Sequence, residues 1–150
     1  MKIYLAGPIN GRIFSEILKD WEDKADRFKK MGYEVLHPLI DKADGLNPNE
    51  VACGEGHNTP VTNNHAIYTR DQWMVRTADI VYADLFDCQR VSIGTMFELA
   101  WSSLLGKHIV VCLPKDSLHY HAFVLESANI IWSTREESEK YLETLIKGIS

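Results

Sequence analysis

The chain has 150 residues, of which 45% are hydrophobic and 25% are charged, proportions that are typical of one globular domain. Its 16 Lys and Arg residues and 21 Asp and Glu residues give a net charge of -5, which excludes the basic surface expected of a protein that binds a nucleic-acid polymer. No apolar run approaches the roughly 18 residues that span a membrane, the turn at Gly7 comes too early for a signal peptide, and three cysteines at irregular spacing favour a reducing compartment. We therefore expect a cytoplasmic protein whose partner is neither a membrane nor a nucleic-acid polymer.

Strand-like and helix-like segments alternate along the chain. Short apolar runs predict strands, and apolar residues at offsets of three and four predict helices. In chain order we expect a strand at 3–6, a helix from 14 to the stop at Gly32, a strand at 33–36, a helix at 66–77, a strand at 79–84, a helix at 95–105, strands at 108–113 and 129–132, and a helix at 134–146. This alternation predicts an α/β fold with one domain over residues 1–150. Helices flank a five-stranded, mainly parallel sheet in a flavodoxin-like or Rossmann-like three-layer sandwich, and ligands bind at the carboxyl ends of the strands.

Residues 41–64 form the longest stretch without periodicity and are rich in Gly, Pro and Asn. A loop of this length inside a compact domain is usually functional or mobile. We expect one of these two properties for it.

Glu98 is the only charged residue between Val91 and Gly106. A carboxylate on an otherwise uncharged helix is expected to be partly buried, and burying an unpaired charge is costly. Two interpretations follow: Glu98 reaches solvent or an arginine at the polar edge of the helix, or it is a catalytic carboxylate. The helix entry from Ser92 to Thr95 favours the second, because small residues and free N–H groups at a helix start bind anions.

Two aspartates are further candidates. Asp71 lies near the start of a predicted helix, where an Asp ordinarily interacts only with the helix dipole, and Asp84 lies at the carboxyl end of a predicted strand, where ligands of parallel sheets bind. The histidines and cysteines lack the spacing of a zinc site, and the glycine-rich motifs of dinucleotide- and phosphate-binding loops are missing from the sequence. We expect neither a metal ion nor a cofactor.

Three parts of the sequence form a recognisable combination: Tyr4-Leu-Ala-Gly-Pro-Ile-Asn-Gly11, the mid-chain helix with Asp71, and Ser92-x-Gly-Thr-x-x-Glu98-Leu-Ala followed by Gly106-Lys107. Together they resemble the nucleoside 2-deoxyribosyltransferase superfamily. The resemblance implies an enzyme that cleaves the N-glycosidic bond of a nucleoside or nucleotide. It implies that Glu98 forms a covalent glycosyl-enzyme intermediate, that Asp71 protonates the departing base, and that Tyr4 orients Glu98.

The resemblance also bears on the substrate. Ser92 stands six residues before Glu98, where relatives that hydrolyse nucleoside 5'-monophosphates have Ser and those that act on free nucleosides have Asp. The Ser92 hydroxyl and the N–H groups of Gly94 and Thr95 favour a phosphate that an Asp would repel. Further substrate contacts are expected from Asp84, Arg12 and the first turn, which comprises Gly7, Pro8, Ile9 and Asn10. Mammalian deoxynucleotide hydrolases of the family have a Ser and an Arg where this chain has Pro8 and Asn10.

Residues 119–129, with His121, resemble the corresponding stretch of bacterial cytidylate N-glycosidases, in which a neighbouring subunit completes the site. We therefore expect a homodimer or higher homo-oligomer with shared active sites that hydrolyses a nucleoside 5'-monophosphate. One alternative is a nucleoside 2'-deoxyribosyltransferase, which residues 44–64 favour if they close over the intermediate as a lid. The other is a noncatalytic nucleotide-binding domain, against which the presence of Tyr4, Asp71 and Glu98 together argues.

Overall fold

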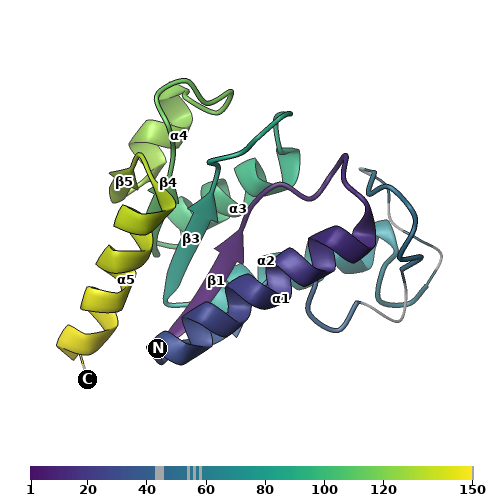
Figure 1. The fold of residues 1–150 in the computed structure, drawn as a ribbon, viewed down its shortest axis with the longest axis horizontal. Helices are drawn as coiled ribbons and strands as arrows, with labels where there is room; N and C mark the ends of the chain where they lie inside the picture. Colours follow the sequence, from purple (N-terminus) through teal and green to yellow (C-terminus); the bar gives the residue numbers. More distant parts are fainter. Residues whose placement is uncertain (43–45, 54, 56, 58, 150) are drawn as a thin grey trace.

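Strands and helices alternate along the chain as the hydrophobic pattern predicts (Figure 1). The computed structural model describes residues 1–42, 46–53, 55, 57 and 59–149. Its elements are β1 (Lys2–Ala6), α1 (Phe14–Met31), β2 (Glu34–Leu36), α2 (Asn64–Thr77), β3 (Ile80–Asp84), α3 (Ile93–Leu104), β4 (His108–Cys112), α4 (Ala122–Ser127), β5 (Ile130–Trp132) and α5 (Arg135–Ile149). The predicted elements lie within three residues of these bounds. Only α4 is missed, because its six residues are too few to show a helical repeat.

The five strands form one parallel sheet in the order β2-β1-β3-β4-β5. This is the flavodoxin-like order, in which the strand sequence reverses between β1 and β3 and leaves a crevice at their carboxyl ends. The predicted fold class is thus confirmed, and every strand pair is parallel.

The sheet separates two apolar cores, and alternation along β1 decides which side chain enters which core. Ile3 and Leu5 pack with α1 and α5, whereas Tyr4 and Ala6 face α2, α3 and α4. Figure 1 shows the resulting layers, with α1 and α5 in front of the sheet and α2 and α3 behind it. Tyr4 is therefore held on the side of α2 and α3. Within the described chain, no helix has both the length and the apolar character that crossing a membrane requires.

The carboxyl ends of β1 and β3 pass close to each other. A Cβ on Gly7 would lie 3.2 Å from the backbone oxygen of Asp84, so glycine permits this approach without a shift of the backbone. The turn ends at Gly11, whose φ of +91° lies in the left-handed region. The first turn therefore runs directly beside the crevice.

Part of the long loop packs against this first turn. The N–H of Gly11 donates to the carbonyl of Ala52 at 2.8 Å, the N–H of Ala52 donates to the carbonyl of Arg12 at 2.8 Å, and Ile13 and Val51 form an antiparallel bridge. Of the segment expected to act as a lid, residues 44, 45, 54, 56 and 58 lie outside the described residues. The loop backbone near Ala52 thus extends the wall that the first turn begins.

Candidate active site

A pocket of about 400 Å³ opens beside the first turn, between the long loop, α2 and α3. Many residues expected at the site line it: Gly7, Ile9, Asn10, Asp71, Ser92, Gly94, Thr95 and Glu98. Three others, Pro8, Arg12 and Asp84, line a neighbouring cleft instead. The fold thus brings residues of the first turn, a mid-chain helix and α3 to one cavity.

Tyr4 and Glu98 form a buried hydrogen bond although they are 94 residues apart in the sequence. The hydroxyl of Tyr4 donates to Oε1 of Glu98 at 2.5 Å, and the two residues are 0% and 5% exposed. Glu98 therefore does not lie at the polar edge of α3. Its carboxyl group points inward to the sheet, where a strand residue holds one of its oxygens.

Burial changes the acidity of both partners. It raises the pKa of Glu98 to about 8, with the hydrogen bond from Tyr4 acting in the opposite direction. The pKa of Tyr4 rises well above its ordinary value, mainly through burial and then through the nearby Glu98 charge. Tyr4 consequently remains a hydrogen-bond donor, and both protonation states of Glu98 are accessible near neutral pH.

Asp71 lies in the middle of α2, so its expected place near the helix start is wrong and the helix dipole does not explain it. The carboxyl group is buried, and its Oδ1 has no hydrogen-bond partner among the described residues. Lys42 Nζ lies 3.6 Å from that oxygen, an ion pair that is longer than a hydrogen bond. Burial raises the pKa of Asp71 to about 6, while Lys42 and Arg70 act to lower it. The pocket therefore holds two carboxyl groups whose pKa values are both raised.

Lys42 is missed by the sequence analysis. It lies in an aperiodic segment, and lysines are usually exposed, so no pattern in the sequence indicates a buried amine. Its place in the pocket results from the turn that follows β2.

An aromatic wall faces the carboxyl groups and is also missed by the sequence analysis. Trp101 of α3 makes edge contacts with Tyr68 of α2 and with Phe97, at ring-centroid distances of 5.2 Å and 5.7 Å. All three side chains line the pocket. The spacing of four between Phe97 and Trp101 places them on one helix face, which is the only signal in the sequence. Such a wall suits a planar, aromatic ligand.

The start of α3 is held in place by a buried histidine. The N–H of Ser92 donates to Nε2 of His119 at 2.9 Å, and the Ser92 side chain caps the helix by accepting from the N–H of Thr95. Burial lowers the pKa of His119, which keeps its ring neutral and able to accept. A Cβ on Gly94 would meet no atom within 4 Å, so there is room beside the first N–H groups of the helix. Free space beside such groups suits an anion.

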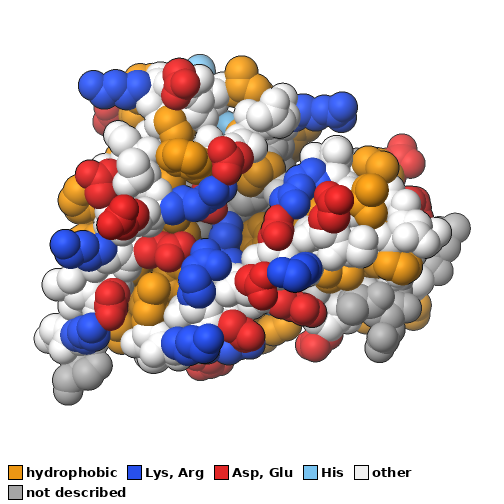
Figure 2. Space-filling view, viewed as in Figure 1, with side chains coloured by type: hydrophobic (Ala, Val, Ile, Leu, Met, Phe, Trp, Pro, Cys, Tyr) orange, Lys and Arg blue, Asp and Glu red, His pale blue; other side chains and the backbone are white. Residues whose placement is uncertain are grey.

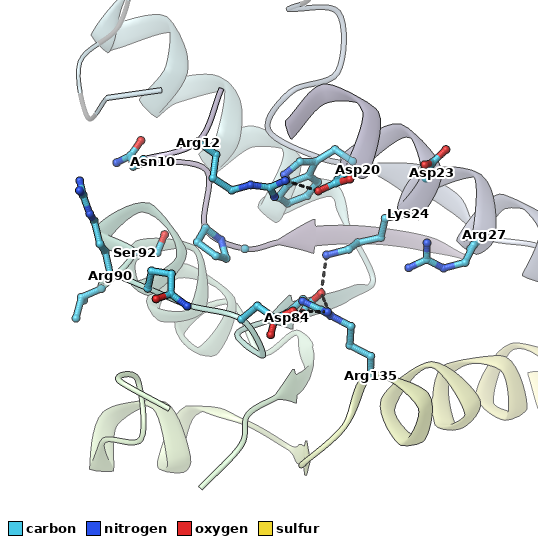
Figure 3. A pocket seen from close by; sticks show the side chains of 17 residues that line it. Asn10, Arg12, Asp20, Asp23, Lys24, Arg27, Asp84, Arg90, Ser92 and Arg135 are labelled. Atoms are coloured by element: carbon cyan, nitrogen blue, oxygen red, sulfur yellow. Dashed lines mark hydrogen bonds and ion pairs between the residues drawn. The ribbon is translucent and has the colours of Figure 1, made fainter. Parts of the chain in front are cut away.

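A larger cleft of about 720 Å³ adjoins the pocket and shares Gly7, Asn10 and Ser92 with it. Basic and acidic side chains from α1 and α5 line this cleft (Figure 3), and the surface between the two helices shows the same mixture of charges (Figure 2). Asp84 accepts from Lys24 at 2.7 Å and from Arg135 at 2.8 Å. Burial alone would raise the pKa of Asp84, but these two cations bring it below its ordinary value. Asp84 is therefore a carboxylate engaged in ion pairs within the protein.

The arginines of the cleft differ in their partners. Arg12 pairs with Asp20 at 2.5 Å, and Arg27 pairs with Glu139 at 3.1 Å. Arg90, in contrast, has no acidic partner in the part of the chain that the structure describes, and its guanidinium lies 3.7 Å from where a Cβ of Gly11 would be. Figure 3 shows the Arg90 side chain extending along the edge of the cleft toward Asn10, and Arg90 lines the cleft and not the pocket that contains Glu98.

His121 is exposed and does not line either cavity. Its Nδ1 accepts a hydrogen bond from the N–H of Phe123 at 3.3 Å and so caps α4. Within one chain, His121 therefore lies away from the pocket that contains Glu98.

The fold and the pocket define an α/β protein with two buried carboxyl groups at the switch point of a flavodoxin-like sheet. A family model described as nucleoside 2-deoxyribosyltransferase matches residues 3–144. The chain therefore belongs to the nucleoside 2-deoxyribosyltransferase family, whose enzymes cleave N-glycosidic bonds. No curated protein matched the sequence.

Several solved structures share the fold. A CMP N-glycosidase from Clostridium botulinum has 18% identity and a TM-score of 0.54, with 96% of this chain and 99% of that chain covered. A 2-deoxyribosyltransferase from Leishmania mexicana has 18% identity and a TM-score of 0.59, with 95% and 97% covered. A conserved protein from Enterococcus faecalis has 15% identity and a TM-score of 0.65, with 100% and 99% covered. At these identities the similarity shows a common fold over the whole chain.

Proposed function

We propose that the protein hydrolyses the N-glycosidic bond of a nucleoside 5'-monophosphate, releasing the free base and (deoxy)ribose 5-phosphate. The observation that supports this most is the buried hydrogen bond between Tyr4 and Glu98 beside a pocket that also contains Asp71. A tyrosine that holds one carboxylate oxygen leaves the other oxygen for attack on carbon. The CMP N-glycosidase with a similar fold acts, by its name, on a substrate of this class.

The reaction has two steps. In the first, Glu98 attacks the anomeric carbon, the bond from this carbon to the base nitrogen breaks, and the base takes the proton of Asp71. In the second, the Asp71 carboxylate takes a proton from water, the water oxygen attacks the anomeric carbon, and the ester to Glu98 breaks. Each group ends in its initial protonation state, so one proton shared by the two carboxyl groups is sufficient.

The walls of the cavity support this choice of substrate. The aromatic wall accommodates the base, while the phosphate lies at the start of α3, where it accepts from the hydroxyl of Ser92 and the N–H of Gly94, since the N–H of Thr95 donates to the Ser92 cap. We assign the balancing positive charge to Arg90 in place of Arg12, because Arg12 pairs with Asp20 whereas Arg90 lies unpaired among the described residues.

One observation favours a second candidate, transfer of the deoxyribosyl group to another base. Ala52, Cys53 and His57 of the long loop line the pocket on the side opposite α3. A loop that covers the intermediate excludes water and prolongs its lifetime, which allows a second base to take the place of water. The family comprises this activity as well.

A second copy of the chain is part of the proposal. Several large apolar side chains on α3 and α4 are exposed: Ile93, Phe97, Leu104 and Phe123. Exposed apolar side chains on two neighbouring helices favour an interface, and a homo-oligomer that covers them would complete the site. The three cysteines are free thiols, which suits work in the reducing cytoplasm.

A panel of nucleosides and their 5'-monophosphates, analysed by chromatography for free base, tests the function. We expect base release to be much faster from a monophosphate than from the matching nucleoside, and a loss of about 1,000-fold or more in Glu98→Gln. Glu55→Gln, which alters another carboxylate lining the pocket, serves as the matched control and retains activity.

The same panel separates the alternatives. Formation of a new nucleoside after addition of a second free base shows a transferase. Undiminished base release by Glu98→Gln contradicts the covalent mechanism for any substrate.

A further inference from the structure

Lys42 is a buried amine that the proposed reaction leaves without a role. Only 4% of the residue is exposed, and a lysine is almost never fully buried unless it is paired. Its Nζ lies 3.6 Å from Oδ1 of Asp71. It is also the only Lys or Arg side chain in the described lining of the pocket.

The backbone before Lys42 is built to direct this side chain inward. Asp41 has φ of 55°, the only positive φ at a non-glycine residue in the described chain. Such backbone is unfavourable and persists where the surroundings impose it. Here Arg70 of α2 donates to the carbonyl of Ile40, and the N–H of Lys42 donates to the carbonyl of Leu39 at 3.2 Å. The turn is therefore attached to the helix that carries Asp71.

The charged groups around Lys42 come from several elements. They determine which groups its ammonium can stabilise. The groups that act on Lys42 are Asp71 and Arg70 of α2 and Glu98 of α3, and Lys42 itself acts on His37 of its own segment. Burial lowers the pKa of His37 to about 4, so His37 is neutral. Arg70 is engaged with a backbone carbonyl. Among the described residues, Lys42 is consequently the cation that pairs directly with Asp71.

We propose that Lys42 is a positioning residue for the proton donor, and that its ammonium group stabilises the Asp71 carboxylate that remains when the base has taken the proton. The inference rests on the proposed function. In this role Lys42 keeps its own proton: burial lowers its pKa, but the carboxyl groups of Asp71 and Glu98 act to raise it, and the 3.6 Å separation from Asp71 is that of an ion pair. The ammonium thereby makes Asp71 a stronger acid towards a base that leaves poorly as an anion.

Two substrates with different leaving groups test this role. We compare Lys42→Met, Lys42→Arg and the exposed-site control Lys115→Met on a nucleoside 5'-monophosphate and on 4-nitrophenyl ribofuranoside 5-phosphate. Nitrophenolate leaves without a proton, whereas the base requires one. We expect kcat of Lys42→Met to fall by about 100-fold on the nucleotide and by less than about threefold on the nitrophenyl substrate. Lys42→Arg keeps the charge and retains most of the activity.

The pH profile and a direct titration give independent readouts. Loss of the cation raises the pKa of Asp71, so the acidic flank of kcat/KM moves to higher pH in Lys42→Met. Carboxyl ¹³C NMR of the substrate-free protein follows the same shift even if no substrate in the panel reacts. If the wild-type protein is inactive on every substrate but the Asp71 titration shifts in Lys42→Met, the proposed function is wrong. The effect of Lys42 on Asp71 is then retained. An unshifted titration, or equal losses on both substrates, overturns the role of Lys42.

Discussion

Glu98 and Asp71 share one proton near neutral pH, and their surroundings determine which of them holds it. Glu98 is the more strongly desolvated group, which raises its pKa to about 8, whereas Lys42 and Arg70 limit the pKa of Asp71 to about 6. The lower pKa of Asp71 favours the proton on Glu98 in the substrate-free pocket. The reaction requires it on Asp71, and the positive charge that develops at the anomeric carbon favours this arrangement, because it stabilises an ionised Glu98.

The pH dependence of kcat/KM tests this pair. We expect a bell-shaped profile with flanks near pH 6 and pH 8, because burial raises the pKa of Asp71 to about 6 and that of Glu98 to about 8. Below the acidic flank both groups are protonated and the nucleophile is lost. Above the alkaline flank both are ionised and the general acid is lost. The measurement is base release from a monophosphate across this range.

Asp71→Asn provides the control for the profile. Because Asn cannot ionise, Glu98 is the group of the pair that still titrates in this variant. The alkaline flank, which reports loss of the general acid, should therefore disappear, and activity should fall. A wild-type profile that is flat through both flanks would exclude the shared proton.

At the scale of elements, α3 carries both the start of the proposed phosphate site and the proposed nucleophile. Ser92 caps the helix, and Glu98 follows less than two turns later, so one rigid element sets the spacing between phosphate and nucleophile. His119 fixes the backbone of Ser92 from the segment before α4. A substitution of the cap residue Ser92 is therefore expected to change which substrate binds without moving the rest of α3.

Substitution of Ser92 separates charge from capping. Ser92→Asp and Ser92→Asn both retain a side chain that caps a helix well, so the stability of α3 is preserved. We expect Ser92→Asp to lower kcat/KM for a 5'-monophosphate by about 100-fold through repulsion of the phosphate, with little loss for the nucleoside. Ser92→Asn, the neutral control, should lose less than about tenfold. Parallel losses for both substrates in Ser92→Asp would indicate that the phosphate binds elsewhere.

At the scale of the whole molecule, one chain provides a pocket and leaves part of the predicted site outside it. His121 caps α4 away from both cavities, beside the exposed side chain of Phe123. Apolar residues on α3 and α4 are exposed over the same region. A partner subunit that covers this face would bring its own His121 to the site and bury the apolar surface at the same time.

Mixing two inactive variants tests a shared site. Glu98→Gln and His121→Ala each remove a residue that, in our proposal, comes from a different subunit of the same site. In a mixed dimer one site regains both residues, so unfolding and refolding an equal mixture should restore about a quarter of the wild-type activity. Sedimentation measurements check that dimers form.

His121→Asn serves as the control in this experiment, because Asn can cap α4 as the histidine does. Full activity of His121→Asn would show that the ring only caps the helix. The absence of any recovery in a mixture that does form dimers would contradict shared sites.

The sequence by itself determined the fold class and the order of the elements, because hydrophobic periodicity and turn residues act over a few neighbouring positions. It also indicated Glu98 through the uncharged helix around it and offered Asp71 as a further candidate, and the family resemblance added Tyr4 and the role of Asp71. The resemblance reached these residues because they lie in compact motifs. Contacts that join distant segments leave no such local trace.

Only the tertiary structure decided the environment of these groups. It revealed Lys42 beside Asp71, the wall around Trp101, and His119 behind Ser92, and it showed that Asp84 is neutralised by Lys24 and Arg135. The physical reason is that ionisation and pairing depend on burial and on the distances between side chains, which packing determines and residue type alone does not.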